Sequence, residues 1–118
     1  SDSKDSNTDA LKSILIFCHE NYTREISLDI VARNLHMNKY YVSHLFNGKL
    51  KISLSDYINK LRITDACRFL TETTDCITKI AYKSGFSSLR SFNRHFQRIT
   101  GFTPMNYRKA YQNEKGAS

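Results

Sequence analysis

Apolar residues recur along this chain at intervals of three and four, the spacing that places them on one side of an α-helix. The clearest stripe consists of Leu11, Ile14, Leu15, Cys18 and Tyr22. Similar stripes follow along the rest of the chain, and no segment keeps the alternation of apolar and polar residues that a half-buried strand requires. The pattern therefore predicts an all-α fold.

Short polar residues stand in front of the later stripes, where they can accept a hydrogen bond from the backbone of a helix's first turn. The expected helix starts are Ser27, Asn38, Ser53, Thr78, Ser87 and Thr103. Ser53 and Asp56 have the spacing of a capping box, and Pro104 follows Thr103 in the preferred order. Together with the first stripe, these starts predict seven helices.

Two glycines and one helix face add detail to this picture. Gly85 and Gly101 each follow an apolar stripe, where a backbone of positive φ commonly ends a helix. Four side chains of the third helix are expected to face the core: Tyr41, Val42, Leu45 and Phe46.

The chain contains an internal repeat. Residues 32–46 match residues 81–96 with one extra residue in the second copy, and the match continues beyond it. The matched pairs include Ala32 and Ala81, Met37 and Phe86, Phe46 and Phe96, and Tyr57 and Tyr107. In each copy the alanine lets two helices cross closely, and the apolar residue of the turn, Met37 or Phe86, pins the corner. The phenylalanine, Phe46 or Phe96, anchors the second helix to the core. Each copy therefore predicts a helix-turn-helix, a motif whose second helix lies in the major groove of DNA.

The repeat predicts two helix-turn-helix units joined by a linker helix, and the expected fold is a seven-helix, homeodomain-like domain. The expected boundaries are 1–7 for a disordered linker remnant, 8–52 for the first unit, 53–71 for the linker helix, 72–112 for the second unit and 113–118 for a disordered tail. The polar opening suggests a cut linker, with a sensory or dimerising domain expected before Ser1.

Charge separates the two parts of the chain. The net charge is +7, and residues 37–118 hold fourteen Lys and Arg against five Asp and Glu. No acidic residue occurs from Cys76 to Asn113. Such a surface suits a polyanion, although charge alone leaves a merely solubilising basic face open.

Five short motifs in the second copy carry a family resemblance: Ile80-Ala81, Gly85-Phe86, Ser91 to Phe96 (SFNRHF), Thr100-Gly101 and Thr103 to Arg108 (TPMNYR). With Leu61-Arg62-Ile63 and Ala66, they resemble the C-terminal DNA-binding domain of the AraC/XylS family of transcription regulators, over about Leu11 to Tyr111. The first copy departs from that pattern at His36 and Lys51, where glycine is expected. The resemblance implies sequence-specific binding of double-stranded DNA by a rigid pair of units.

The exposed faces of the two second helices carry the candidate reading residues. By resemblance, the base-reading positions are Tyr40, Ser43, His44, Leu89, Arg90, Asn93 and Arg94. Arg can bond guanine, Asn can bond adenine, and Leu89 or Tyr40 can contact a thymine methyl. His44 is equally compatible with a polar surface role, and His95 is expected to be structural.

Further cations are expected to hold the DNA backbone without reading sequence. The candidates are Lys39, Lys49, Lys51, Lys60, Arg62, Arg98 and Lys109. Arg62 has the alternative of pairing with a carboxylate inside the linker region. The helix starts near Ser27 and Thr78 are expected to offer backbone N–H groups to phosphates.

Other classes of function fit the sequence less well. Three cysteines and four histidines lack metal-site spacing and no catalytic constellation stands out, so neither an enzyme nor a cofactor is expected. The odd, unpaired cysteines favour a reducing compartment, hence the cytoplasm, and no apolar run reaches the length of a membrane span. A non-specific nucleic-acid binder stays open as the alternative. A helical adaptor lacks an exposed apolar stripe, and RNA polymerase is the expected protein partner.

Overall fold

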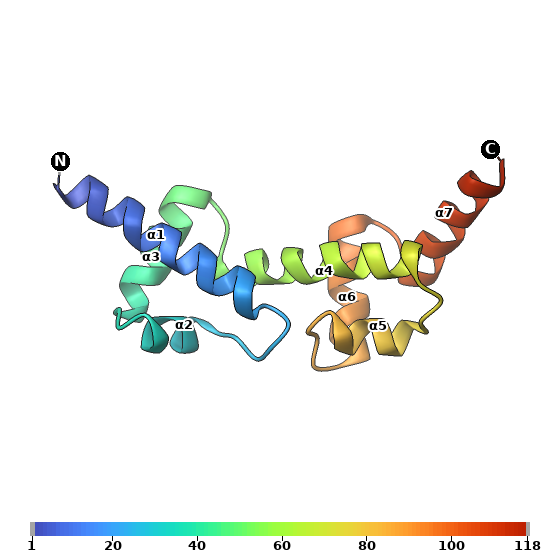
Figure 1. Ribbon diagram of the computed structural model, residues 1–118, viewed down its shortest axis with the longest axis horizontal. Coiled ribbons are helices and arrows are strands. Elements are labelled where there is room, and N and C mark those ends of the chain that lie inside the picture. The colour runs from blue at the N-terminus through green and yellow to red at the C-terminus, as the bar shows by residue number, and fades with distance from the viewer. Residues whose placement is uncertain (1, 118) are drawn as a thin grey trace. The chain divides into compact units, whose positions relative to one another are not determined.

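The computed structural model describes residues 2–117, and side chains from residue 6 to residue 114. This part of the chain contains seven helices and no strand (Figure 1). Their bounds are α1 Asp2–Asn21, α2 Leu28–Asn34, α3 Lys39–Leu50, α4 Leu54–Glu72, α5 Ile77–Lys83, α6 Leu89–Thr100 and α7 Pro104–Ala117. The all-α, seven-helix prediction is confirmed. None of these helices is long and apolar enough to cross a membrane.

The two segments expected to be disordered are largely helical. Helix α1 begins at Asp2, and α7 continues past residue 112 to Ala117. Extending an existing helix requires no new nucleation, so polar residues can continue it without an apolar stripe. Asn7 is also tied to unit 1, because its Oδ1 accepts a hydrogen bond of 2.7 Å from the Tyr41 hydroxyl. The outermost positions of the expected remnant and tail, Ser1 and Ser118, lie outside the described residues.

Most helix starts lie where the capping residues predict them. Ser27 and Asn38 accept hydrogen bonds from the first turns of α2 and α3. Ser53 Oγ accepts from Asp56 N at 3.1 Å, and Thr103 Oγ1 accepts from Asn106 N at 3.1 Å.

Two predicted starts were wrong, one for α6 and one for α5. Helix α6 is capped by Ser88, whose Oγ accepts from Ser91 N, and not by Ser87. Two adjacent serines offer the same capping chemistry, so sequence alone does not choose between them. Helix α5 begins at Ile77 rather than Thr78, and no side chain caps it. This start lets Ile77 pack against the core of its unit.

The chain folds as two compact units, residues 1–58 and 59–118, which we call unit 1 and unit 2. The buried apolar residues of unit 1 are Ile14, Cys18, Val31, Ala32, Val42, Leu45, Phe46, Leu54 and Ile58. Tyr41, expected among them, is 39% exposed. It lies at the edge of the buried face of α3, where its hydroxyl reaches Asn7 instead of the interior.

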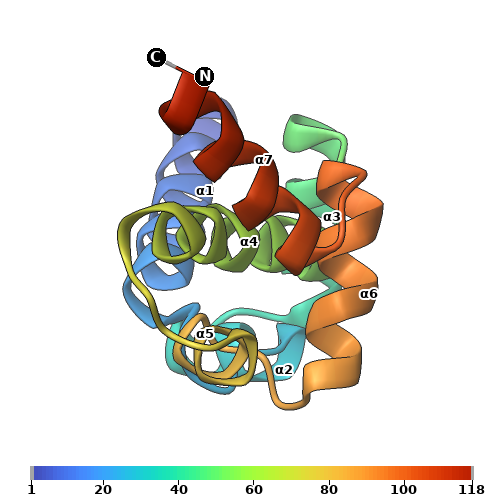
Figure 2. The same ribbon diagram turned by 90° about the vertical axis from the view of Figure 1, so that its right-hand side faces the viewer.

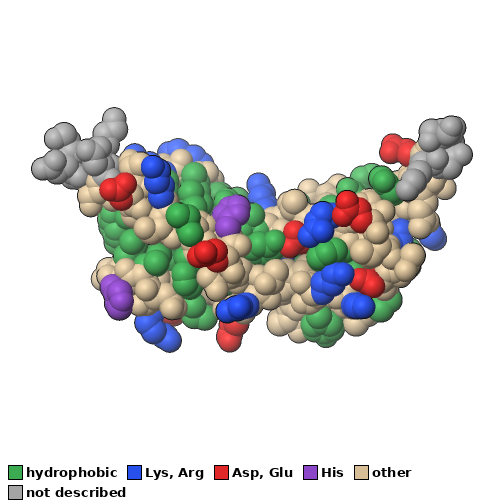
Figure 3. Space-filling view, viewed as in Figure 1, with side chains coloured by type: hydrophobic (Ala, Val, Ile, Leu, Met, Phe, Trp, Pro, Cys, Tyr) green, Lys and Arg blue, Asp and Glu red, His purple; other side chains and the backbone are tan. Residues whose placement is uncertain are grey.

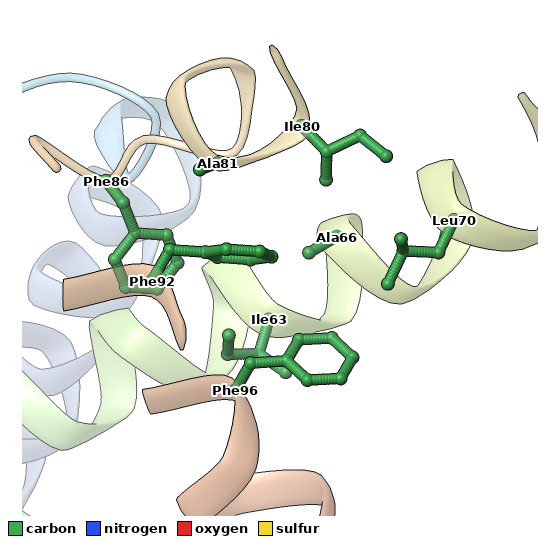
Figure 4. Packing of buried hydrophobic residues seen from close by; sticks show 8 residues of the cluster. All are labelled: Ile63, Ala66, Leu70, Ile80, Ala81, Phe86, Phe92 and Phe96. Atoms are coloured by element: carbon green, nitrogen blue, oxygen red, sulfur yellow. The ribbon is translucent and has the colours of Figure 1, made fainter. Parts of the chain in front are cut away.

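Three phenylalanines dominate the core of unit 2. Phe86, Phe92 and Phe96 pack with short apolar side chains of α4 and α5 (Figure 4). The remaining members of this cluster are Ile63, Ala66, Leu70, Ile80 and Ala81. The rings of Phe86 and Phe92 meet edge to face at 5.4 Å, and those of Phe92 and Phe96 lie 5.6 Å apart. The aromatic pinning of the second turn by Phe86 is thus confirmed.

Helix α4 belongs to both units. Its first turn completes unit 1, where the Tyr57 ring packs edge to face on Phe46 at 5.3 Å. Its later turns supply Ile63, Ala66 and Leu70 to unit 2. The structure therefore divides the chain after Ile58, inside the helix expected to be a separate linker over 53–71. Within α4 the buried side chains change sides: Leu54 and Ile58 lie on one face of the helix, and Ile63, Ala66 and Leu70 lie on nearly the opposite face, so each half meets a different core.

Candidate nucleic-acid interface

The turns between α2 and α3 and between α5 and α6 have the same hydrogen bonding. Met37 N donates to Ala32 O at 2.8 Å, and Phe86 N donates to Ala81 O at 3.1 Å. The residue before each donor has positive φ, 56° at His36 and 108° at Gly85. The internal repeat is therefore present in the backbone geometry, and each copy is a helix-turn-helix.

The second helices of the two motifs also end alike. Lys51 N donates to Asn47 O at 3.0 Å with φ of 58°, and Gly101 N donates to Gln97 O at 2.9 Å with φ of 81°. His36 and Lys51, the two departures from the family pattern, thus adopt the left-handed conformation that glycine tolerates best. For a residue with a Cβ this conformation costs roughly 1 kcal/mol.

Anchoring of the inner faces leaves the outer faces of α3 and α6 open. Phe46 and Phe96 have no exposed surface, and in Figure 2 no helix of unit 2 covers the outer side of α6. A shift of 50 residues relates the outer positions pairwise: Tyr40 and Arg90, Ser43 and Asn93, His44 and Arg94, Asn47 and Gln97. All are exposed except Ser43, which is half-buried.

The predicted base-reading residues are therefore brought onto two matching faces. Tyr40 is 73% exposed at the start of α3. Arg90 and Arg94 are exposed on α6, and no ion pair to either is found among the described residues. Leu89 differs from the rest, because it is half-buried and packs against the core of unit 2. Only part of its side chain faces outward.

The predicted phosphate-binding residues have varied surroundings. Lys49, Lys51, Lys60 and Lys109 are exposed. Lys39 is exposed too, with its Nζ 3.5 Å from Asp29 Oδ1 and 5.4 Å from the centre of the Tyr40 ring. Arg98 Nη2 lies 3.3 Å from His95 Nδ1.

Arg62 is set apart from these cations. It is half-buried on α4, with its guanidinium 5.6 Å from the centre of the Phe86 ring. Burial lowers the pKa of Arg62 from its ordinary value.

Three basic residues of the acid-free stretch are engaged within unit 2. Lys79 and Lys83 both hold the Asp75 carboxylate, at 3.4 and 2.7 Å, and the hydrogen bond from Lys83 holds the pKa of that carboxyl below its ordinary range. Arg108 donates from Nε to Leu70 O and from Nη2 to Thr73 O, closing the C-terminal end of α4. The face of unit 2 drawn in Figure 3 accordingly mixes acidic with basic side chains. Asp75 stands one residue before the acid-free stretch, so a count of charges within that stretch misses this pairing.

Comparison with known proteins places these features in a family. Residues 31–110 match the family described as a helix-turn-helix domain, a span that includes both motifs. The chain is 35% identical over 97 residues to the uncharacterized HTH-type transcriptional regulator YtdP of Bacillus subtilis, covering 82% of this chain and 13% of that protein. It is 33% identical over 108 residues to the transposon Tn10 TetD protein of Escherichia coli, covering 92% of this chain and 78% of that protein.

Two solved structures share the fold. The AraC-type transcriptional regulator from Chromobacterium violaceum has a TM-score of 0.79 at 23% identity, covering 91% of this chain and 96% of that one. The DNA-binding domain of AdpA, solved in complex with a target DNA, has a TM-score of 0.84 at 20% identity, covering 92% and 97%. At these identities the likeness shows the fold alone. The family match, which covers most of the chain, confirms the resemblance read from the motifs: the chain belongs to the AraC/XylS-type helix-turn-helix family, the DNA-binding domains of transcription regulators.

Proposed function

We propose that this chain binds double-stranded DNA sequence-specifically, with α3 and α6 each placed in a major groove. The observation that carries the proposal is the pair of matching exposed faces, Tyr40 to Asn47 on α3 and Arg90 to Gln97 on α6. Both follow the same turn and are anchored by the same buried phenylalanine. A second helix held on one side and open on the other is the arrangement with which a helix-turn-helix contacts base edges.

The chemistry of each face suggests what it reads. Arg90 and Arg94 can each donate two hydrogen bonds to guanine O6 and N7, and Asn93 can pair with adenine N6 and N7. On α3, Ser43 and His44 offer polar contacts, while the Tyr40 ring and the outward part of Leu89 offer apolar contact to a thymine methyl. The two faces carry different residues, so we expect the two halves of the DNA site to differ in sequence.

Exposed cations flank both faces and would fix the position of the DNA backbone. We assign this role to Lys39, Lys49, Lys51, Arg98 and Lys109, which are all exposed. The half-buried Arg62, packed over Phe86, is better suited to holding α4 against the turn of unit 2. Lys83 and Arg108 are left out, because Lys83 bonds Asp75 at 2.7 Å, closer than the 3.5 Å between Lys39 and Asp29, and Arg108 bonds two backbone oxygens of unit 2.

A non-specific nucleic-acid binder is the weaker alternative. Its affinity would rest on phosphate contacts, which favour lysine along the groove-facing surface. The two faces instead carry Ser43, Asn47, Asn93 and Gln97 beside two arginines, and these side chains distinguish one base edge from another.

The proposal also covers the domain and the protein partner with which this chain would act. The matched region makes up 13% of YtdP, and 35% of the melibiose operon regulatory protein of Escherichia coli, which leaves room in such regulators for a domain that receives a signal. We propose that this chain acts together with such a domain and contacts RNA polymerase. Three free cysteines suit the reducing cytoplasm, where the chromosome of a bacterium lies.

A pair of variants tests which residues read bases and which hold the DNA backbone. Arg94→Ala should weaken binding to a duplex selected from a random pool by about 1–3 kcal/mol and relax the preference at one base pair. Lys109→Ala, which removes another exposed cation, should weaken binding to selected and random duplexes equally. The proposal fails for Arg94 if its variant also weakens every sequence by the same factor.

A further inference from the structure

An open hollow lies in unit 2 where the outer face of α6 meets the beginnings of α5 and α7. Its volume is about 350 Å³. Six residues line it: Ile77, Asn93, Gln97, Thr103, Pro104 and Met105. Asn93 and Gln97 also belong to the outer face of α6, so the hollow is continuous with the proposed reading surface.

The lining of the hollow is mainly apolar and contains no charged side chain. Pro104 is buried, Ile77 packs against the core of unit 2, and Met105 is 47% exposed. Such a surface offers no ion pair to a phosphate. In the major groove the apolar group of a base edge is the C5-methyl of thymine, which distinguishes A·T from G·C pairs.

We infer that this hollow receives the methyl group of a thymine, with Met105 as a specificity-determining residue. The inference rests on the proposed DNA binding and adds a contact beyond the predicted readers. Met105 has the flexible, polarizable side chain that adapts to an apolar group of fixed shape. The amides of Asn93 and Gln97 border the same hollow, so an adenine bonded by one of them and a thymine methyl beside Met105 can be read together.

The internal repeat restricts this contact to one half of the DNA site. The shift of 50 residues that pairs α3 with α6 places Ser55 in unit 1 opposite Met105 in unit 2, and Leu54 opposite Pro104. Ser55 is exposed and short, and cannot supply the apolar surface that Met105 provides. We therefore expect thymine methyl recognition by this route only where α6 binds.

The test uses the full chain and a duplex that it has selected from a random pool, with each thymine replaced in turn by deoxyuridine. Loss of a buried methyl should weaken binding about threefold to fivefold at one or two neighbouring positions on the side read by α6. Met105→Ala should bind the original duplex correspondingly more weakly and should no longer distinguish thymine from deoxyuridine at those positions. Met105→Leu, which keeps an apolar side chain, should retain the discrimination.

Ile16→Ala serves as the control, since it truncates another exposed apolar side chain, 59% exposed on α1 of unit 1. It should leave the deoxyuridine profile unchanged. Equal thymine and deoxyuridine affinities for the unaltered chain at every position would overturn the inference while leaving sequence-specific binding intact. So would a Met105→Ala variant that binds more weakly yet keeps the full discrimination, because Met105 would then contact the sugar-phosphate backbone. Failure to select any preferred duplex would instead count against the proposed function itself.

Discussion

The rings of Phe96 and Tyr107 pack edge to face, with centroids 5.6 Å apart and planes inclined at 86°. The equivalent pair in unit 1, Phe46 and Tyr57, has 5.3 Å and 73°. In each unit this contact joins the second helix of the motif to the first turn of the helix that follows. The position of each proposed reading helix therefore depends on a buried phenylalanine that faces away from the reading surface.

Replacement of Phe96 by alanine should lower the free energy of unfolding by about 3–5 kcal/mol, because it leaves a cavity against Tyr107 and Phe92. Phe102→Ala is the matched control: this ring also contacts Tyr107, but it is 47% exposed. Its loss should cost less than about 1 kcal/mol. Urea denaturation of the two variants measures both values. Similar small losses would show that Phe96 does not anchor α6.

Glycine at the two left-handed positions of unit 1 should stabilise the protein. His36 and Lys51 have φ of 56° and 58°, and their counterparts in unit 2 are Gly85 and Gly101. His36→Gly and Lys51→Gly should each raise the free energy of unfolding by about 0.5–1 kcal/mol, because glycine adopts this backbone without steric strain. Lys49→Gly, inside α3, should instead lower it by about 1 kcal/mol. Destabilisation by all three would mean that the strain at His36 and Lys51 is negligible.

Replacement of Ser84 by alanine should stabilise the protein. It has no exposed surface, and its Oγ has no hydrogen-bond partner within the described part of the chain. Removing a buried, unpaired hydroxyl should stabilise the fold by about 1 kcal/mol. The same substitution at Ser88, whose Oγ caps α6, should destabilise it by a similar amount, about 1 kcal/mol. Thermal melting decides, and a lower midpoint for Ser84→Ala would show that its hydroxyl is bonded in solution.

Two of the three free thiols, Cys18 and Cys76, should differ sharply in reactivity. Burial raises the pKa of Cys18 from its ordinary value of about 9 to about 11, whereas the Cys76 side chain is exposed. Since the fold favours the neutral thiol, the stability that Cys18 contributes is complete below pH 9 and is lost as the pH rises towards 11. At pH 8 a thiol reagent should modify Cys76 rapidly and Cys18 only after denaturation.

Single-cysteine variants assign each rate in that experiment. Cys18→Ala should remove part of the loss of stability between pH 9 and 11. Fast labelling of Cys18 in the folded protein would contradict its burial in unit 1.

The local features of the fold could be predicted from sequence, and the features that depend on distant contacts could not. Ser27, Asn38 and Thr103 cap helices because their side chains bond the backbone two or three residues away, which the sequence shows directly. The choice of Ser88 over Ser87 as the cap of α6 could not be predicted, because two adjacent serines offer the same capping chemistry. Helix α4 is different: its division between two cores has a signal in its own sequence, because its buried apolar positions change face between Ile58 and Ile63.

The features of the candidate site likewise divide into those that the sequence predicts and those that depend on distant contacts. The repeat places Arg90, Asn93 and Arg94 on the outer face of α6, because that face is the complement of Phe92 and Phe96. The engagement of Arg108 with Leu70 O spans 38 residues of chain and leaves no signal in the sequence. The hollow beside Met105 likewise depends on how three helices pack, because it forms where the outer face of α6 meets the beginnings of α5 and α7.

Competition between duplexes tests the central proposal most directly. The chain first binds a labelled duplex that it has selected from a random pool. This duplex is then displaced either with unlabelled copies of itself or with a random duplex of the same length, at the same salt concentration. Sequence-specific recognition predicts that the selected duplex competes about a thousandfold better or more. Equal competition by the random duplex would show that the chain holds DNA through its phosphates alone, and would contradict base reading by α3 and α6.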